Sequence, residues 1–368
     1  MTRVVLAPDS FKGTITAVDA AAALADGWAS VDPTAEFVHR PMADGGEGTM
    51  AAFEAAVPGA VRMPLTVDGL AGQRVDTCWL LLPPTENAPA GTAVVDLGST
   101  SGIELLHELC PWDADTTGLG QALAAALDHG VSRLVVGIGS SASTDGGTGM
   151  LTALGVRFLD AAGAPVARGA RGLDDIASVD LSALRAAPEV RVLTDVTNPL
   201  TGPRGAAAVF GPQKGLRAAE DIALVDDGLR RLADLLRIDP AGQGHGAAGG
   251  TGAAFAAWGG VLAPGAAEVA ALIDLAGAIA DADVVVTGEG SYDAQSGDGK
   301  VPSFLAGLAA AAGARAMLAA GRISDDADTA PFAACASLTA LAGSSEAALA
   351  EPGRWLREAG AALARTLV

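Results

Sequence analysis

The sequence is poor in the residues that build disulfide scaffolds, zinc sites and all-β cores. It contains three cysteines in 368 residues, and they are widely spaced without a C-x-x-C pattern. This count implies neither a disulfide framework nor a cysteine-based zinc site and fits a reducing compartment. Aromatic residues make up only 4% of the chain, whereas alanine and glycine dominate. That composition favours close-packed helices joined by tight turns over a β-sandwich.

Basic residues are also scarce. The chain has 23 lysines and arginines against 43 acidic residues, which gives a formal net charge of −20. Nucleic acids and anionic membranes bind through clusters of lysine and arginine, so neither is an expected partner. An anionic ligand must therefore be held by local positive groups that act against the overall field.

No hydrophobic run indicates a targeting or transmembrane segment. The apolar run at residues 4–7 is too short for a signal peptide. The longest charge-free stretch, residues 246–267, carries seven glycines and Pro264, which predicts a loop with packed turns rather than a membrane span. We therefore expect a soluble, cytoplasmic protein.

Several catalytic signatures are missing. The chain has neither the P-loop pattern Gly-x-x-x-x-Gly-Lys-Ser/Thr nor Gly-x-Ser-x-Gly, and its four histidines form no i, i+4 pair. A P-loop enzyme is thereby excluded, and a zinc hydrolase is disfavoured. A Ser-His-Asp triad stays open, but no pattern indicates one.

What the chain does have is an alternation of short β-branched runs, glycine-rich turns and Ala/Leu-rich helices. The first unit is a strand at 4–7 followed by a helix at 17–28, which Thr16 can cap. Such βα units predict an α/β fold with a mostly parallel sheet, and this length predicts two domains. Between residues 60 and 98 the strand-like runs lack intervening helices, which indicates a mixed sheet and a domain boundary near residue 65. Further predicted strands lie at 36–41, 75–82, 92–97, 133–138, 191–194, 283–287, 314–319 and 335–339, and further helices begin near 49, 119, 222 and 354.

Five predicted strand ends carry glycines, small hydroxyls and carboxylates. In an open parallel sheet, ligands bind beyond the carboxyl ends of the strands, and glycine-rich turns present backbone N–H groups that suit phosphate. One such loop is weak evidence, but five together indicate a phosphate site. They are residues 9–10, 44–46, 139–147, 195–198 and 288–290.

The three lysines, Lys12, Lys214 and Lys300, all lie beside glycine in predicted loops. Twenty arginines occupy the other basic positions, so these lysines are candidates for places that require a compact ammonium group. A kinase needs such charges with Mg²⁺ to neutralise phosphates, and a base for the acceptor hydroxyl. Carboxylates available for the metal and base roles are Asp44, Glu47, Asp195, Glu289 and Asp293.

At these loops the chain resembles the bacterial type I glycerate kinase family, also called glycerate 2-kinases. The motifs that carry the resemblance span nearly the whole chain in the expected order. They are Ala-Pro-Asp-Ser-Phe-Lys-Gly at 7–13, Pro-Met-Ala-Asp-Gly-Gly-Glu-Gly-Thr at 41–49, Asp-Val-Thr-Asn-Pro-Leu at 195–200, Val-Phe-Gly-Pro-Gln-Lys-Gly at 209–215 and Thr-Gly-Glu-Gly at 287–290.

The resemblance implies ATP- and Mg²⁺-dependent phosphorylation of D-glycerate, an organic acid, at the 2-hydroxyl to give 2-phosphoglycerate; 3-phosphoglycerate is the less favoured product. It also implies a discontinuous Rossmann-like parallel-sheet domain (1–65 plus 265–368) and an inserted α/β domain with a mixed sheet (66–264), with the active site in the cleft. The sequence leaves a homodimer open.

The strand-end loops and the resemblance together give the expected site. We expect catalytic roles for Lys12, Asp195 and Asp293, and Mg²⁺ ligation by Asp195 and Glu289. Either Asp195 or Asp293 is expected to accept the hydroxyl proton. Substrate or phosphate binding is expected of Asp9, Ser10, Asp44, Gly45, Gly46, Ser141, Asp145, Asn198, Lys214, Glu289 and Lys300.

Two departures from the family pattern affect the expected substrate. Residues 139–147 read Gly-Ser-Ser-Ala-Ser-Thr-Asp-Gly-Gly where Gly-Gly-Ser-Ala-Thr-Asn-Asp-Gly-Gly is expected, and Ser291 replaces the arginine of Gly-Glu-Gly-Arg. Losing an arginine that can pair with a carboxylate or phosphate alters binding. Ser291 therefore favours one alternative, a kinase for another small hydroxy acid. The second alternative is a non-catalytic metabolite-binding regulator that keeps the cleft but has lost turnover.

Overall fold

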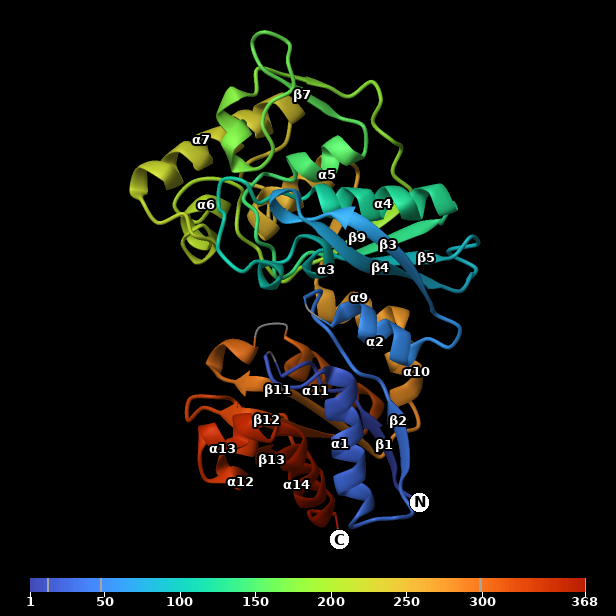
Figure 1. Cartoon of the computed structure of the whole chain (residues 1–368). Coiled ribbons are helices and arrows are strands. Elements are labelled where there is room, and N and C mark those ends of the chain that lie inside the picture. The colour runs from blue at the N-terminus through green and yellow to red at the C-terminus, as the bar shows by residue number, and fades with distance from the viewer. Residues whose placement is uncertain (12, 47, 298–299, 368) are drawn as a thin grey trace. The chain divides into compact units, whose positions relative to one another are not determined.

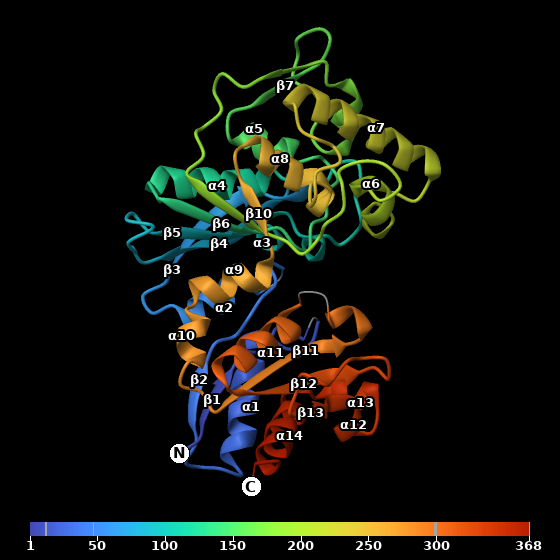
Figure 2. The same ribbon diagram turned by 180° about the vertical axis from the view of Figure 1, so that it is seen from behind.

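The computed structural model describes residues 1–11, 13–46, 48–297 and 300–367. The chain divides into two compact units, Met1–Pro58 with Pro264–Val368, and Gly59–Ala263 (Figures 1 and 2). The predicted boundary at residues 65 and 66 falls inside a strand of the second unit, β3 (Val61–Asp68).

The first unit is built on a five-stranded parallel sheet with the order β13-β12-β11-β1-β2. Both ends of the chain contribute to it, since β1 pairs with β11 through Val4 and Val284. The strands are β1 (Arg3–Leu6), β2 (Glu36–His39), β11 (Val284–Tyr292), β12 (Arg315–Ile323) and β13 (Ala334–Ser337). The helices are α1 (Ala17–Ala29), α2 (Thr49–Ala56), α9 (Gly265–Leu272), α10 (Leu275–Ile279), α11 (Val301–Ala312), α12 (Leu338–Ala342), α13 (Ser345–Ala350) and α14 (Pro352–Arg365).

Glycines let the two long helices of this unit, α1 and α14, approach closely on one face of the sheet, whereas α11 covers the other face (Figures 1 and 2). A Cβ atom on Gly27 of α1 would lie 1.9 Å from the carbonyl oxygen of Arg357, and one on Gly360 of α14 would lie 2.3 Å from that of Leu24. Helix α1 begins as predicted, because the hydroxyl of Thr16 accepts a hydrogen bond from the backbone N–H of Asp19 at 3.1 Å.

The second unit is built on a six-stranded mixed sheet with the order β10-β9-β6-β5-β4-β3. Strands β10, β9, β6 and β5 are parallel, whereas β4 and β3 add on as antiparallel strands. The strands are β3, β4 (Arg74–Leu82), β5 (Thr92–Asp96), β6 (Arg133–Gly137), β9 (Glu189–Leu193) and β10 (Val261–Ala263), and a separate hairpin is made by β7 (Arg157–Leu159) and β8 (Ser178–Asp180). The helices are α3 (Gly98–Ser101), α4 (Thr117–His129), α5 (Thr148–Ala153), α6 (Ala206–Phe210), α7 (Ala219–Leu236) and α8 (Thr251–Ala257).

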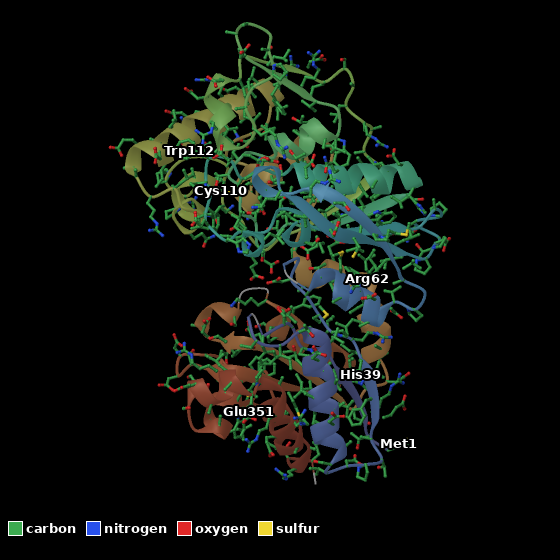
Figure 3. All side chains as sticks on the ribbon, viewed as in Figure 1. Met1, His39, Arg62, Cys110, Trp112 and Glu351 are labelled. Atoms are coloured by element: carbon green, nitrogen blue, oxygen red, sulfur yellow. The ribbon has the colours of Figure 1, made fainter. Side chains whose placement is uncertain are left out.

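The predicted fold class, a parallel-sheet unit and an α/β unit with a mixed sheet, is therefore confirmed. Each unit has its own apolar core: Leu6, Trp28 and Val286 are among the core residues of the first, and Leu123, Val136 and Phe255 of the second. The three cysteines are free thiols, and Cys110 is labelled in Figure 3. None of the helices in the described ranges is long and apolar enough to cross a membrane.

Three local predictions were wrong. Residues 246–267, predicted as a loop, form a 3₁₀ turn at Ala247–Gly250, then α8, β10 and the start of α9. Residues 288–290, predicted as a turn, continue β11 because β12 pairs with them, Gly288 opposite Ala319. Leu338 and Thr339, predicted as the end of a strand, begin α12.

Candidate active site

Loops from two strands of the first unit open onto one cavity. After β1, the backbone N–H of Asp9 donates to the carbonyl oxygen of Gly288 at 2.8 Å, so the chain follows β11 beyond the strand end. The Asp9 carboxylate accepts the N–H of Ser10 at 2.7 Å. After β2, the Asp44 carboxylate accepts the N–H of Gly46 at 3.0 Å, in a turn where Gly45 has a φ of 92°, which favours glycine. Asp9, Ser10 and Asp44 line a cavity of about 520 Å³.

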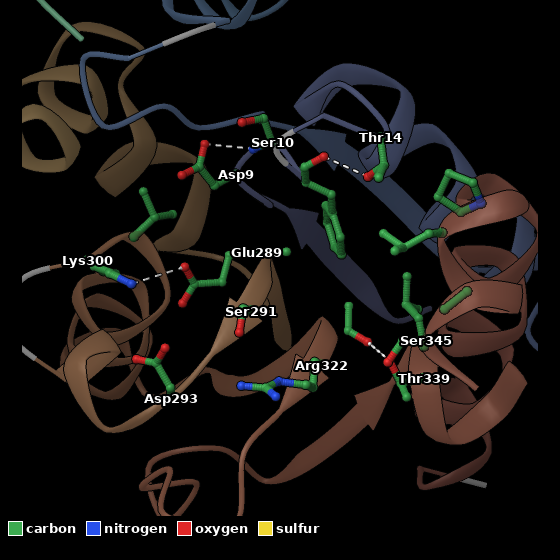
Figure 4. A pocket seen from close by; sticks show the side chains of 18 of the residues that line it. Asp9, Ser10, Thr14, Glu289, Ser291, Asp293, Lys300, Arg322, Thr339 and Ser345 are labelled. Atoms are coloured by element: carbon green, nitrogen blue, oxygen red, sulfur yellow. Dashed lines mark hydrogen bonds and ion pairs between the residues drawn. The ribbon is translucent and has the colours of Figure 1, made fainter. Parts of the chain in front are cut away.

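Strand β11 supplies a second wall of the same cavity. Glu289, Ser291 and Asp293 recur at every second residue, so they share one face of the extended chain, and all three line the cavity. The ammonium of Lys300 lies 3.8 Å from a carboxylate oxygen of Glu289 and donates to the hydroxyl of Ser296 at 3.3 Å. The structure thus gathers Asp9, Ser10, Asp44, Glu289, Asp293 and Lys300 of the predicted site (Figure 4).

The remaining walls come from segments that the sequence did not indicate. Arg322 at the end of β12, Thr339 of α12 and Ser345 of α13 add polar groups, and the hydroxyl of Thr339 donates to the carbonyl oxygen of Gly321 at 2.9 Å (Figure 4). Apolar side chains also line the cavity: Phe11, Val301, Leu338, Ala348, Leu349 and Pro352. The cavity therefore combines a charged wall with an apolar wall.

A smaller cavity, of about 290 Å³, lies at the ends of β6 and β9 in the second unit. The loop at 139–147 follows β6, and Ser140 in it has a φ of 59°, in the left-handed region that non-glycine residues seldom adopt. Lys214 reaches into this loop: its Nζ atom donates to the hydroxyl oxygen of Ser141 and to the carbonyl oxygen of Ser143, both at 2.6 Å. Both Ser141 and Lys214 line the cavity.

Lys214 is only 3% exposed, and this burial lowers the pKa of its ammonium group to about 7, although nearby Asp145 acts in the opposite direction. Asp145 is fully buried, and burial together with Asp115 raises the pKa of its carboxyl group. Four protein donors nevertheless reach that carboxylate: the N–H and hydroxyl of Thr116 at 3.0 and 2.8 Å, the N–H of Gly147 at 3.2 Å and the N–H of Gly149 at 3.1 Å. Asp145 therefore fixes the end of the loop from inside.

The neighbouring Asp115 completes this buried polar network, which the sequence did not reveal. Its carboxylate is held by Arg168 through two hydrogen bonds of 2.9 Å each and by the N–H of Thr117 at 2.7 Å. Asp115 and Arg168 are 53 positions apart, and no motif links them, so only the fold brings them together.

Asp195 and Asn198, the two site residues predicted after β9, lie beside different cavities. Asp195 is exposed and lies between Thr194 and Val196, which line the 290 Å³ cavity. Asn198 instead donates through its amide to the carbonyl oxygen of Arg204 at 2.8 Å and lines another cavity of about 420 Å³. Lys12 and Glu47 lie outside the described residues.

The cavity of about 520 Å³ in the first unit is called the larger cavity below. Its oxygen donors fit a hard cation that is shared with phosphates. Within the described ranges, no group of three or more His, Cys, Asp or Glu side chains is arranged to hold a metal ion by itself. Mg²⁺ in phosphoryl-transfer sites usually takes only one or two carboxylates and completes its shell with phosphate and water oxygens. Asp9, Asp44, Glu289 and Asp293 offer such oxygens in one cavity.

Comparisons with known proteins identify the family of the chain. The model of the glycerate kinase family matches residues 4–368. The glycerate kinase of Bacillus subtilis (strain 168) and the glycerate 2-kinase of Escherichia coli (strain K12) are each 37% identical to this chain over 335 residues, which cover 88% of this chain and 86% of theirs.

A solved structure extends the agreement to the whole fold. The crystal structure of a protein assigned as glycerate kinase 2 from Salmonella typhimurium LT2 matches with a TM-score of 0.85 and 36% identity, covering 100% of this chain and 98% of its own. The chain therefore belongs to the glycerate kinase family.

Proposed function

We propose that this chain transfers the γ-phosphoryl group of ATP to the 2-hydroxyl of D-glycerate and releases ADP and 2-phosphoglycerate. The observation that carries the proposal is the larger cavity, where carboxylates from the ends of β1, β2 and β11 meet Lys300, the residue before α11. Family membership supports the same reaction, since relatives of similar length are named glycerate kinase and glycerate 2-kinase.

In this reaction the substrate hydroxyl oxygen forms a bond to the γ-phosphorus while the bond from that phosphorus to the β,γ-bridging oxygen breaks. The bridging oxygen leaves with ADP, and the hydroxyl proton passes to a carboxylate, Asp195 or Asp293. Lys12 and Ser10 contact phosphate or the substrate carboxylate. Bound Mg²⁺ would neutralise phosphate charge. We assign Glu289, in the cavity of the first unit, as one carboxylate ligand, and we assign Asp195 as a second on the family motif alone.

The second unit contributes through its own strand-end loops. Lys214 and Asp145 both hold the loop at 139–147, so its small residues keep one backbone conformation. The 290 Å³ cavity beside this loop is large enough for a three-carbon acid. We therefore assign Ser141 and Lys214 to acid or phosphate binding, with Asp145 acting through the backbone. Asn198 lines a different cavity, so its assignment to substrate binding rests on the family motif alone.

Ser291 favours one alternative, a kinase for a different small hydroxy acid, because a hydroxyl stands where the family pattern has a guanidinium. An ADP-release assay with ATP and D-glycerate, L-glycerate or related hydroxy acids distinguishes these functions. We expect D-glycerate to give the highest kcat/KM. Turnover with another acid alone supports the alternative, and ATP binding without ADP release from any acid supports a regulator.

The position of the phosphate can be read from the product directly. A phosphate ester at carbon 2 couples to one proton and gives a doublet in the ³¹P spectrum, whereas an ester at carbon 3 couples to two protons and gives a triplet. We expect the doublet. A triplet would identify the product as 3-phosphoglycerate and correct the proposed regiochemistry.

A further inference from the structure

Among the described residues, two basic side chains line the larger cavity of the first unit, Lys300 and Arg322. They differ in their ion pairs and hydrogen bonds. Lys300 is paired with Glu289 and hydrogen-bonded to Ser296. Arg322 is exposed, and its guanidinium makes no ion pair or hydrogen bond with any residue in the described ranges. The cavity therefore contains a guanidinium whose hydrogen-bonding capacity is available to a ligand.

The position of Arg322 is fixed by the sheet. It lies directly opposite Ser291, since β11 and β12 run parallel with these two residues as register partners. Register partners project from the same face of a sheet, and both side chains line the cavity (Figure 4). The short hydroxyl of Ser291 leaves room for the long side chain on the neighbouring strand. The family pattern has arginine at position 291, and this chain instead has its guanidinium one strand away.

We propose that Arg322 binds the phosphate groups of the nucleotide in this cavity and so replaces a guanidinium at position 291. The inference rests on the proposed phosphoryl transfer. Guanidinium groups suit this task because their planar fork of donors matches two phosphate oxygens at once. The lining carboxylates Asp9, Asp44, Glu289 and Asp293 and the net charge of −20 would repel a polyphosphate, so a cation with no protein partner is needed there.

The shape of the cavity favours the nucleotide over the small acid as the ligand of Arg322. Its volume of about 520 Å³ lies in the range of cofactor-sized sites. Its apolar wall, with Phe11, Leu338 and Leu349, can cover a purine base. A three-carbon acid has no apolar part that would need such a wall. Arg322 lies in the same cavity as this wall and the carboxylates, which is where the phosphates of a bound nucleotide would extend.

The experiment compares ADP with adenosine, because only ADP carries phosphate. Calorimetric titration of the full chain with each ligand gives the two affinities. We expect Arg322→Gln to weaken ADP binding by about 10- to 100-fold, as for one lost charge-assisted contact, and to leave adenosine binding unchanged. The KM for ATP should rise in step, whereas the KM for D-glycerate should not. The matched control is Arg315→Gln on the opposite end of β12, which should bind ADP normally.

A reciprocal exchange tests the positional argument. Arg322→Ser should lose ADP affinity, and the double variant Ser291→Arg with Arg322→Ser should recover most of it by returning the guanidinium to β11. Circular dichroism and thermal unfolding verify that each variant is folded. The inference is overturned if the wild type does not bind ADP, or if ADP affinity is the same with and without Arg322. It is also overturned if the Arg322 variants lose affinity for D-glycerate only. If the wild type binds ADP through Arg322 but turns over no acid, the proposed function fails and this inference stands.

Discussion

The Nζ atom of Lys214 lies 2.6 Å from the hydroxyl oxygen of Ser141, although the two residues are 73 positions apart. A second bond of 2.6 Å joins the same Nζ atom to the carbonyl oxygen of Ser143. A side chain from the Gly-Pro-Gln-Lys segment thus holds the loop that follows β6. Two N–H donors satisfy these two acceptors, so the bonds persist when the amine is neutral. Lys214 can therefore hold the loop without carrying a permanent buried charge.

The depressed pKa of Lys214 predicts that stability rises with pH. The folded protein releases this proton near pH 7, whereas the unfolded chain keeps it until its ordinary pKa of 10.5. The unfolded state then binds more protons between these values, so the free energy of unfolding rises across that window, by at most about 1.4 kcal/mol per pH unit. Urea unfolding of the wild type and of Lys214→Met at about pH 7 and pH 9 checks this. We expect the wild type to gain relative to the variant, and an unchanged difference would contradict the assignment.

Replacing Asp145 should destabilise the second unit. In the wild type, donors of Thr116, Gly147 and Gly149 contact the Asp145 carboxylate. In Asp145→Asn an NH₂ group replaces one carboxylate oxygen, so at least one of these contacts is lost in a fully buried site. We expect a loss of about 2–4 kcal/mol in the free energy of unfolding. The control is Asp160→Asn, whose carboxylate accepts two backbone N–H groups in a surface turn and whose loss should stay below about 1 kcal/mol. Equal losses in both variants would contradict the prediction.

The strands and helices that local chemistry specifies were predictable. The Thr16 cap and the β-branched run before it define β1 and α1, and the apolar residues of α7 recur at three- and four-residue steps. Helix α8 could not be recognised in the same way, because Thr251, Gly252, Ala253, Ala254 and Phe255 are all buried and leave no polar face to reveal a helical period. Likewise, β11 continues through Gly288 only because β12 pairs with it, and pairing across sequence distance is invisible locally.

Some residues of the candidate site were predictable from the sequence and others were not. Asp9, Asp44 and Glu289 were predictable as neighbours because they lie at the carboxyl ends of parallel strands, which meet at one edge of a sheet. Arg322 and Thr339 were not, since neither lies in a glycine-rich loop and only the register and packing bring them to the cavity. The burial of Asp145 was equally hidden, because a sequence does not show which carboxylate of a polar loop turns inward.

Two glycine substitutions in the first unit should have opposite effects on the free energy of unfolding. In Gly288→Ala, the new Cβ atom would lie 2.0 Å from the carbonyl oxygen of Ala319, so the strands must separate. We expect a loss of about 2–4 kcal/mol in unfolding free energy, together with reduced activity. Gly307→Ala in α11 meets no atom within 4 Å and should stabilise the protein by about 0.5–1 kcal/mol. Thermal unfolding of both variants provides the test, and a destabilised Gly307→Ala would contradict the helix assignment.

We expect Lys12 to stabilise the negative charge of the phosphoryl group while it is transferred. We expect Lys12→Met to lower kcat/KM by about a hundredfold or more, by analogy with the loss of one donor to a developing anion. Lys12→Arg retains the charge but not the compact ammonium, so it should recover part of the activity. Steady-state kinetics with ATP and D-glycerate measure both variants. Turnover at the wild-type rate in Lys12→Met would remove Lys12 from the catalytic machinery.

The two candidate bases can be separated by their response to metal concentration. Replacing the carboxylate that accepts the hydroxyl proton should lower kcat by about 10²- to 10⁴-fold, with little change in either KM and no rescue by added Mg²⁺. Replacing a carboxylate that positions the metal should instead raise the Mg²⁺ concentration needed for half-maximal rate, because fewer oxygens hold the ion. Kinetics of Asp195→Asn and Asp293→Asn over a range of Mg²⁺ concentrations distinguish these patterns. Asp293 lines the cavity that contains Glu289, Lys300 and Arg322. If both variants keep the wild-type kcat at every Mg²⁺ concentration, neither carboxylate is the base, and the proton must leave by another group.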